Sequence, residues 1–385
     1  MNSVEKFELD FKNFFQSKYS FSFWKARVGL YAILKAIGIS NGDEIILPGY
    51  TCVMNVNPIK YLGAKPVYVD IEPYTFNINP DLIEQKITNK TKVIIAQHTY
   101  GYICDMDKIS AIAQKYNIPI IEDCCLTLGS TYKGKLAGTF GKAAYFSFQW
   151  NKPFTTGLGG MVITNNDILA ERIERICKSQ LVQPSIKEKL MLLAQLIVYR
   201  AFIYPRTTAM AQSFFRFLTK KGIVIGSSSS SEFEPVMEKD FFKAMSCIQA
   251  KSGIRQLKKL ENNIEHRKKI ANLYDELLSK KGWLARRYDK SILDPVMVRY
   301  PLRIKEREKA IAEAAGEGIE LGSWFECPLH PIETPLERYD YILGMCPEAE
   351  KASREVVNLP LHPRATEKTV RQTVKFITRF TPVTD

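Results

Sequence analysis

Short apolar runs alternate with segments of helical periodicity through the first half of the chain. Apolar residues between positions 25 and 37 recur every three or four residues, which predicts a helix there. Further helical periods lie at 80–87 and 106–116. Apolar runs predict strands at 44–47, 66–69, 93–96, 118–121, 143–148 and 161–164. Such runs joined through helices indicate a largely parallel sheet covered on both faces, whose ligands lie beyond the carboxyl ends of the strands.

The second half of the chain has a different pattern. After a predicted helix at 167–179, residues 186–226 are rich in apolar and basic side chains, with seven Lys and Arg residues against the single acid Glu188. A serine run, 227–231, predicts a loop, and a long basic helix begins near 241. A strand is predicted at 296–304 and a final helix at 367–380. We therefore predict two domains, 1–240 with an apolar, basic helical insertion at about 186–226, and 241–385.

Composition and charge narrow the class of protein. The chain has 385 residues, of which 45% are hydrophobic and 25% charged, so it is neither disordered nor fibrous. Its net charge of +13 favours anionic partners. The first residues do not resemble a signal peptide, and the eight cysteines form no CxxC pair, which predicts reduced thiols and a cytoplasmic location. The four histidines are far apart in sequence, so we expect no metal site.

An acid and an amine stand at the strand ends where a ligand is expected. Asp123 closes a buried apolar run, and Lys152 follows another and precedes a glycine-rich turn. Taken alone, Asp123 fits a helix cap and Lys152 a surface lysine. Together they fit pyridoxal phosphate, which needs a lysine to hold it as a Schiff base and an acid for its ring nitrogen. Ser147 and the start of the helix at Ala26 and Arg27 would supply donors for its phosphate.

Several stretches resemble the DegT/DnrJ/EryC1/StrS family of nucleotide-sugar aminotransferases. They are GDEIILPGYT (42–51), GAKPVYVDIEPYTFNINP (63–80), YGYICDMDKI (100–109), IIEDCCLTLGSTYKGKLAGTFGKAAYFSF (120–148), GLGGMVITNN (157–166) and VVNLPLHPRAT (356–366). The resemblance implies an α/β, aspartate-aminotransferase-like fold (fold type I), with a large domain built on a mostly parallel sheet and a smaller C-terminal α+β domain. It also implies a homodimer with interface active sites, which moves an amino group, usually from glutamate, to a nucleotide-linked keto-sugar.

Carried over by position, the resemblance assigns roles to individual residues. Lys152 matches the Schiff-base lysine, which also moves the proton, and Asp123 matches the acid at the ring nitrogen. Ser147 matches a phosphate ligand, and Ala26 and Arg27 match the phosphate-binding turn. Family members with histidine in place of the lysine are dehydratases, so the lysine favours transamination.

Other positions depart from the family pattern. Leu126 replaces a glutamine that contacts the cofactor's ring hydroxyl, Cys52 replaces a stacking aromatic residue, and residues 242–245 (FKAM) replace an Asn-Tyr-Arg-Met stretch whose asparagine reaches the partner's phosphate. The serine run 227–231 is a possible source of the missing donors, although a loop is its simpler interpretation. These changes concern how the ring is tuned and the contact across the subunit interface.

Weaker substrate candidates are His98, at a strand end, Trp150, beside the lysine, and His330, in a turn. Core packing is an equally good interpretation of His98 and a simpler one of Trp150. Two further interpretations of the whole chain stay open: a family member that binds cofactor without turnover, and a protein that binds membrane surfaces through 186–226. For that segment we favour an insertion packed on the dimer interface or the substrate cleft. No nucleic-acid module is evident.

Overall fold

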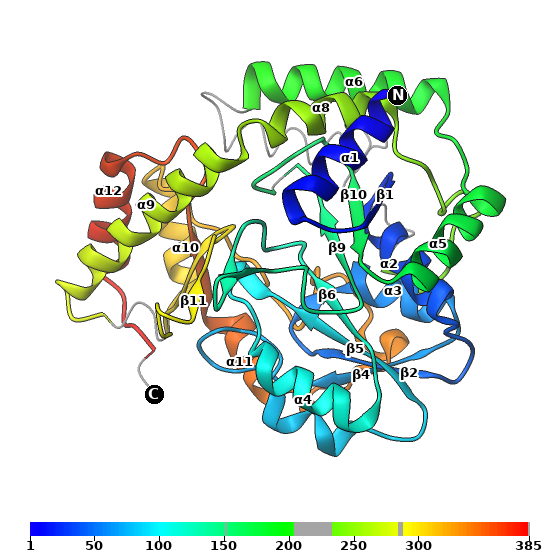
Figure 1. Cartoon of the computed structure of the whole chain (residues 1–385). Helices are drawn as coiled ribbons and strands as arrows, with labels where there is room; N and C mark the ends of the chain where they lie inside the picture. Colours follow the sequence, from blue (N-terminus) through cyan, green and yellow to red (C-terminus); the bar gives the residue numbers. More distant parts are fainter. Residues whose placement is uncertain (151, 204–232, 284–287, 384–385) are drawn as a thin grey trace.

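A seven-stranded sheet forms the centre of the larger part of the molecule in the computed structural model, which describes residues 1–150, 152–203, 233–283 and 288–383 (Figure 1). Its strand order is β1-β10-β9-β6-β5-β2-β4. Only β10 runs against its neighbours in this sheet, so the sheet is mostly parallel as predicted. The strands are β1 (Tyr19–Phe23), β2 (Glu44–Pro48), β4 (Lys65–Val69), β5 (Thr91–Gln97), β6 (Ile120–Asp123), β9 (Ala143–Ser147) and β10 (Gly160–Thr164).

Helices cover this sheet. They are α1 (Ser3–Phe15), α2 (Ala26–Ile37), α3 (Val53–Tyr61), α4 (Met106–Tyr116) and α5 (Asp167–Gln180). Helix α2 packs against β9 and β10, and ten of its twelve residues are buried. The six predicted strands and the helices at α2, α4 and α5 are confirmed. The prediction of a helix at 80–87 is wrong in kind, because this stretch forms two 3₁₀ turns, Pro80–Leu82 and Glu84–Lys86.

The C-terminal part is smaller and lies to one side of the sheet (Figure 1). Its strands β12 (Tyr300–Arg303) and β14 (Val356–Leu359) pair antiparallel. Its helices are α9 (Leu260–Ser279), α10 (Arg307–Gly316), α11 (Pro347–Glu355) and α12 (Glu367–Ile377). The two parts together give the expected α/β fold with a smaller C-terminal α+β unit.

The long basic helix predicted from residue 241 is two helices. Helix α8 (Cys247–Leu257) ends at Lys258, and α9 starts after Lys259. Helix α8 packs against α1, whereas α9 continues into the C-terminal part and packs against α12 (Figure 1). The domain boundary near residue 240 therefore stays a prediction, and the chain crosses between the two parts at the α8–α9 break.

The predicted insertion begins with helix α6 (Ile186–Val198), followed by one π-helical turn, Tyr199–Ile203. Its first turn is closed by a capping box between Ser185 and Glu188. The rest of the insertion and the serine run 227–231 lie outside the described residues. No helix in the described part of the chain is long and apolar enough to cross a membrane.

Candidate active site

Asp123 lies at the carboxyl end of β6, with 2% of its surface exposed. Its two carboxylate oxygens are held by different groups. The side-chain amide of Asn55, on α3, donates to Oδ2 at 2.6 Å, and the backbone N–H of Cys125 donates to Oδ1 at 2.8 Å. Asn55 also donates to Gln97 Oε1 at 3.2 Å, and Gln97 is the residue in register with Asp123 on β5. These hydrogen bonds fix the orientation of the carboxylate at the sheet edge.

Glu122, the preceding residue, points to the opposite face of the sheet, as strand alternation requires. Its carboxylate accepts hydrogen bonds from the backbone N–H groups of Gly138, Phe140 and Gly141 at 2.6–2.7 Å. His98 is fully buried with it, Nε2 lying 3.1 Å from Glu122 Oε2. The structure thus places His98 away from the face of Asp123. His98, Glu122 and Cys124 lie close enough for a metal, but this carboxylate already holds the 138–141 turn, so we assign the cluster a structural role.

Lys152 lies on the loop that joins β9 to β10, and side chains of α8 and α9 hold that loop at three backbone carbonyls. Asn263 donates to the carbonyl of Pro153 at 2.6 Å. Ser252 donates to that of Thr155 at 3.3 Å, and Gln249 donates to that of Leu158 at 2.9 Å. The lysine is therefore fixed by residues about 100 positions later in the chain.

The amine of Lys152 lies over an aromatic ring, 4.6 Å from the centre of the Trp324 indole. Burial lowers its pKa, and the nearby acidic groups of Cys125 and Asp123 oppose this shift. A lowered pKa makes the free, nucleophilic amine available at a lower pH than for an exposed lysine. Trp324 is itself held through its backbone, because its carbonyl accepts from the Tyr100 hydroxyl and its N–H donates to Asn358 at 2.9 Å.

The start of α2 lies against the glycine turn that follows Lys152. A Cβ on Gly160 would lie 2.4 Å from Ala26 Cα, so only glycine permits this approach. Gly160 also pairs with Ser147, at the end of β9. The end of β9 therefore lies near the first turn of α2. The N-cap residue, Lys25, has no side-chain acceptor that could cap the helix, and a helix N-terminus without a side-chain cap suits an anion. Arg27 is buried and directed at the Met54 thioether.

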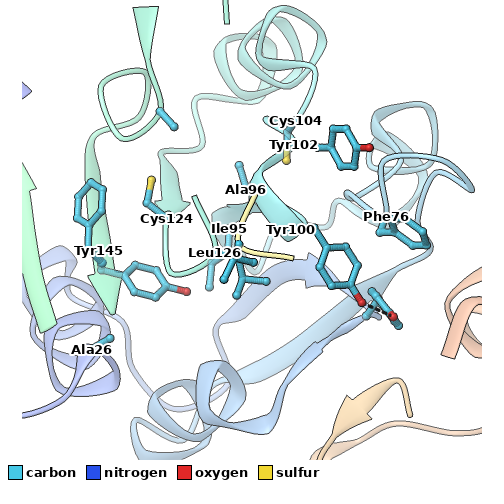
Figure 2. Close-up of a cluster of buried hydrophobic side chains, with 14 of the residues drawn as sticks. Ala26, Phe76, Ile95, Ala96, Tyr100, Tyr102, Cys104, Cys124, Leu126 and Tyr145 are labelled. Carbon is cyan, nitrogen blue, oxygen red and sulfur yellow. Dashed lines mark hydrogen bonds between the residues drawn. The ribbon is translucent and has the colours of Figure 1, made fainter. Parts of the chain in front are cut away.

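Cys52 lies at the N-cap of α3, next to these groups. Burial raises the pKa of its thiol, and the positive charges of Arg27 and Lys152 oppose the rise. The thiol is therefore neutral near pH 7. Leu126, in contrast, belongs to a buried hydrophobic cluster with Ile95 and Tyr145 and offers no polar atom (Figure 2).

Trp150 packs under α6 in the described structure. Its ring lies 5.0 Å from that of Tyr199, whose hydroxyl donates to the Trp150 carbonyl at 2.9 Å. Leu192 and Leu196 of α6 complete the same apolar cluster. Trp150 thus holds α6 against the lysine loop, and these contacts give it a packing role.

The 242–245 stretch is also part of the monomer's own packing. Lys243 is buried and pairs with Glu188 at the start of α6 and with Asp240. Its carbonyl accepts from the N–H of Trp24 at 3.0 Å, and Ala244 bridges to Phe23 of β1.

His330 does lie at the site. The short strands β13 (Leu329–His330) and β3 (Thr51–Cys52) pair in parallel, and His330 is the partner of Cys52 in this pairing. Burial, together with the positive charges of Arg299 and Lys152, lowers the pKa of His330 to about 4. The ring is therefore neutral at pH 7.

Five residues of this site were not predicted from the sequence. They are Asn55, Gln97, Cys125, Arg299 and Trp324. The sequence held a signal for Gln97. It stands next to His98 at the end of the same apolar run, and successive side chains of a strand point to opposite faces of the sheet, so either residue could have faced the site.

The sequence profile of the DegT/DnrJ/EryC1/StrS aminotransferase family matches residues 2–191 and 226–378. The chain belongs to this family. Its members are pyridoxal-phosphate-dependent aminotransferases, and this protein is therefore an aminotransferase that uses that cofactor.

Full-length relatives include proteins with named activities. GDP-perosamine synthase of Caulobacter vibrioides is 30% identical over 379 residues, covering 96% of this chain and 88% of that protein. UDP-2-acetamido-2-deoxy-3-oxo-D-glucuronate aminotransferase of Pseudomonas aeruginosa is 30% identical over 361 residues, covering 94% and 86%. Among solved structures, an aminotransferase from Psychrobacter cryohalolentis superimposes with a TM-score of 0.74 at 25% identity, covering 97% of this chain and 90% of that one.

The arrangement of groups around Asp123 fits the cofactor. An amine, Lys152, and a carboxylate, Asp123, lie close enough for their charges to interact. The Tyr145 hydroxyl is fully buried beside the Asp123 carboxylate and interacts with it, which adds a polar group to the same side of the site. Bound there, pyridoxal phosphate supplies an electron sink for the bonds of an attached amino acid.

Proposed function

We propose that the protein transfers an amino group from an amino acid, with glutamate as the expected donor, to the ketone carbon of a sugar linked to a nucleoside diphosphate. The observation that carries this proposal is the pairing of an amine of lowered pKa at Lys152 with a hydrogen-bonded carboxylate at Asp123 on the ligand edge of the sheet. The names of two full-length relatives, one acting on a GDP-sugar and one on a UDP-sugar, support the class of acceptor.

In this proposal each residue has one task. Lys152 would hold the cofactor and, as a free amine, would move the proton at the carbon that bears the donor's amine. Asp123 would keep the ring nitrogen protonated, and Asn55 orients Asp123 through its hydrogen bond. Ser147 and the first turn of α2, at Ala26 and Arg27, bind the phosphate, and Cys52 lies against the ring.

The substrate candidates are revised accordingly. His330 is retained as an uncharged residue that lines the sugar pocket, because it pairs with Cys52 and the charge of Lys152 helps to lower its pKa. His98 and Trp150 are not part of the proposed site, since the first pairs with Glu122 and the second supports α6.

We also propose a homodimer in the cytoplasm, with α6 contributing to the subunit contact. Its outer face exposes an apolar row in which Ile186, Leu190 and Ile197 are 74%, 60% and 59% exposed. A second subunit would bury this row.

An anionic membrane surface is the other partner that would suit this apolar row and its neighbouring lysines. A Leu190→Glu variant that sediments as a monomer, where the unaltered protein is a dimer, supports the dimer; flotation of the unaltered protein with anionic vesicles supports the membrane.

Two stages of one experiment test the proposed reaction. The cofactor-loaded protein is first mixed with single amino acids, and conversion of the cofactor to its aminated form is followed by absorbance. The aminated protein is then mixed with GDP-, UDP- and dTDP-linked keto-sugars, and the amino-sugar is detected by mass spectrometry. Amination with glutamate and transfer to one of these sugars are expected. Bound cofactor that no amino acid aminates would instead identify a family member without turnover.

A further inference from the structure

Arg299, which directly precedes β12, lies beside the reacting amine although it is 147 positions further along the chain. Its guanidinium carbon lies 5.2 Å from the centre of the Trp324 ring, the same ring that Lys152 approaches at 4.6 Å. A Cβ on Gly322 would lie 2.3 Å from Arg299 Nη1. The glycine therefore leaves the space in which the guanidinium lies, and the guanidinium and the Lys152 amine both contact the same indole.

Neighbouring arginines of the C-terminal part make hydrogen bonds or ion pairs with protein groups, whereas among the described residues Arg299 has only its contact with the Trp324 ring. Arg303 pairs with Glu355 at 2.6 Å and also with Glu348. Arg307 donates to the Val356 carbonyl at 2.9 Å. For Arg299 the described structure contains neither a hydrogen bond nor a carboxylate within 4 Å. A partly buried guanidinium left in this state is costly unless a ligand supplies the missing acceptors.

The charges around Arg299 also point to an anionic ligand. Burial lowers the pKa of Arg299, and the charge of Glu320 only partly opposes this. Glu320 itself accepts a hydrogen bond from His362 at 2.8 Å. Burial lowers the pKa of His330, and the positive charges of Arg299 and Lys152 lower it further, so both cations lie near this ring. Arg299 and Lys152 are thus two cations near the same indole, and the acids nearest to them, Glu320 and Asp123, only partly oppose the lowering of their pKa values, so the site favours a further anion.

We propose that Arg299 binds a carboxylate of the substrate through the two parallel N–H groups of its guanidinium. This inference rests on the proposed function, and it adds the side chain that recognises the carboxylate of the substrate. The planar fork of arginine matches a carboxylate in a bidentate pair. In an amino acid the carboxylate is attached to the carbon that bears the amine, so an anion site beside Lys152 is at the right place for it. The diphosphate of a nucleotide sugar is separated from the reacting carbon by the sugar ring and is a poorer match.

A carboxylate at this place has two sources, the amino donor or an acidic acceptor sugar, and two unreactive probes separate them. Glutarate represents the donor without its amine, and methyl glucuronide, the methyl glycoside with a free carboxylate, represents an acidic sugar. Binding of each probe to the cofactor-loaded protein is measured by titration calorimetry. Arg299→Gln is compared with Arg299→Lys, which keeps the charge but not the fork, and with Arg379→Gln, which removes an exposed arginine of the same part of the molecule.

Arg299→Gln is expected to weaken binding of one probe roughly 10- to 100-fold, Arg299→Lys less, and Arg379→Gln by less than about twofold. If only glutarate binding is weakened, Arg299 binds the donor's carboxylate; if only methyl glucuronide binding is weakened, Arg299 binds the carboxylate of the sugar. Equal binding by Arg299→Gln and the unaltered protein, or no binding of either probe by the unaltered protein, overturns the inference. Failure of the proposed function is a different result, namely an unaltered protein whose cofactor no amino acid aminates.

The rate of cofactor amination provides a check that separates binding from damage to the site. Arg299→Gln is expected to slow amination by glutamate in the same ratio as it weakens glutarate binding, if the donor is the source. Reaction with propylamine, which has no carboxylate, is expected to be unchanged in the same variant. A variant that loses both reactions equally has a damaged site, which contradicts a specific carboxylate contact.

Discussion

Replacing Asn263 by alanine tests whether α9 positions Lys152, the proposed catalytic lysine. The Asn263 amide donates to the Pro153 carbonyl at 2.6 Å, one residue after Lys152, and its oxygen accepts from Arg267 Nε at 2.8 Å. The substitution removes both hydrogen bonds. Arg267 keeps its hydrogen bonds to the Met297 and Val298 carbonyls, at 3.1 and 3.0 Å, so α9 itself is expected to stay in place.

The expected cost follows from these two hydrogen bonds. At roughly 0.5–1.5 kcal/mol each, the free energy of unfolding falls by about 1–3 kcal/mol, which lowers the melting temperature by a few degrees. The larger effect is expected on the reaction. A displacement of a reacting group by about 1 Å costs up to roughly 100-fold in rate, so kcat is expected to fall by about 10- to 100-fold. The KM for glutamate is expected to change little, because Asn263 does not line the proposed carboxylate site.

Asn262→Ala is the matched control, because it makes the same substitution at the neighbouring, exposed position of α9. The assay follows cofactor amination by glutamate in a stopped-flow instrument, normalised to bound cofactor, with thermal melting measured in parallel. If Asn263→Ala and Asn262→Ala aminate at the same rate, the loop does not depend on α9 and the positioning argument is wrong.

Two further predictions concern the glycine turn and the amine. Gly160→Ala is expected to separate the turn from Ala26 and to weaken cofactor binding by more than tenfold. The control is Gly316→Ala, where a Cβ meets nothing within 4 Å and cofactor binding is expected to stay unchanged. Fluorescence titration with pyridoxal phosphate compares the two variants. In the cofactor-free protein, burial lowers the pKa of Lys152, so its acylation by acetic anhydride is expected to rise with pH earlier than that of surface lysines. Because the charge of Asp123 opposes the lowering of the Lys152 pKa, Asp123→Asn is expected to move the rise in Lys152 acylation to still lower pH. Peptide mass mapping measures the acylation of Lys152 at each pH. A shift of the rise to higher pH, or no shift, contradicts this electrostatic account.

The sheet and the two central site residues were predictable because each has a local signal. Parallel strands buried on both faces are apolar throughout, and Asp123 and Lys152 interrupt or follow such runs. The strand β1 was missed although YSFSF alternates, because its only partner in the sheet, β10, is about 140 residues away. The break between α8 and α9 carries no glycine or proline, so nothing in the sequence around Lys258 marks it.

The rest of the site depends on distant contacts. His98 was chosen over Gln97 because the register between β5 and β6, which pairs Gln97 with Asp123, cannot be read from either strand alone. Arg299 and Trp324 come from the C-terminal part and meet Lys152 only through folding. Trp150 was a substrate candidate by its position next to the lysine in sequence, but its contacts with α6 decide its role.

Borohydride reduction of the cofactor-loaded protein, followed by peptide mass mapping, tests the central claim most directly. The reduction makes the link between cofactor and lysine permanent, so the modified residue can be identified. The account predicts a single pyridoxyl adduct on Lys152. An adduct on a different lysine, or none on a protein that retains its cofactor, would contradict it.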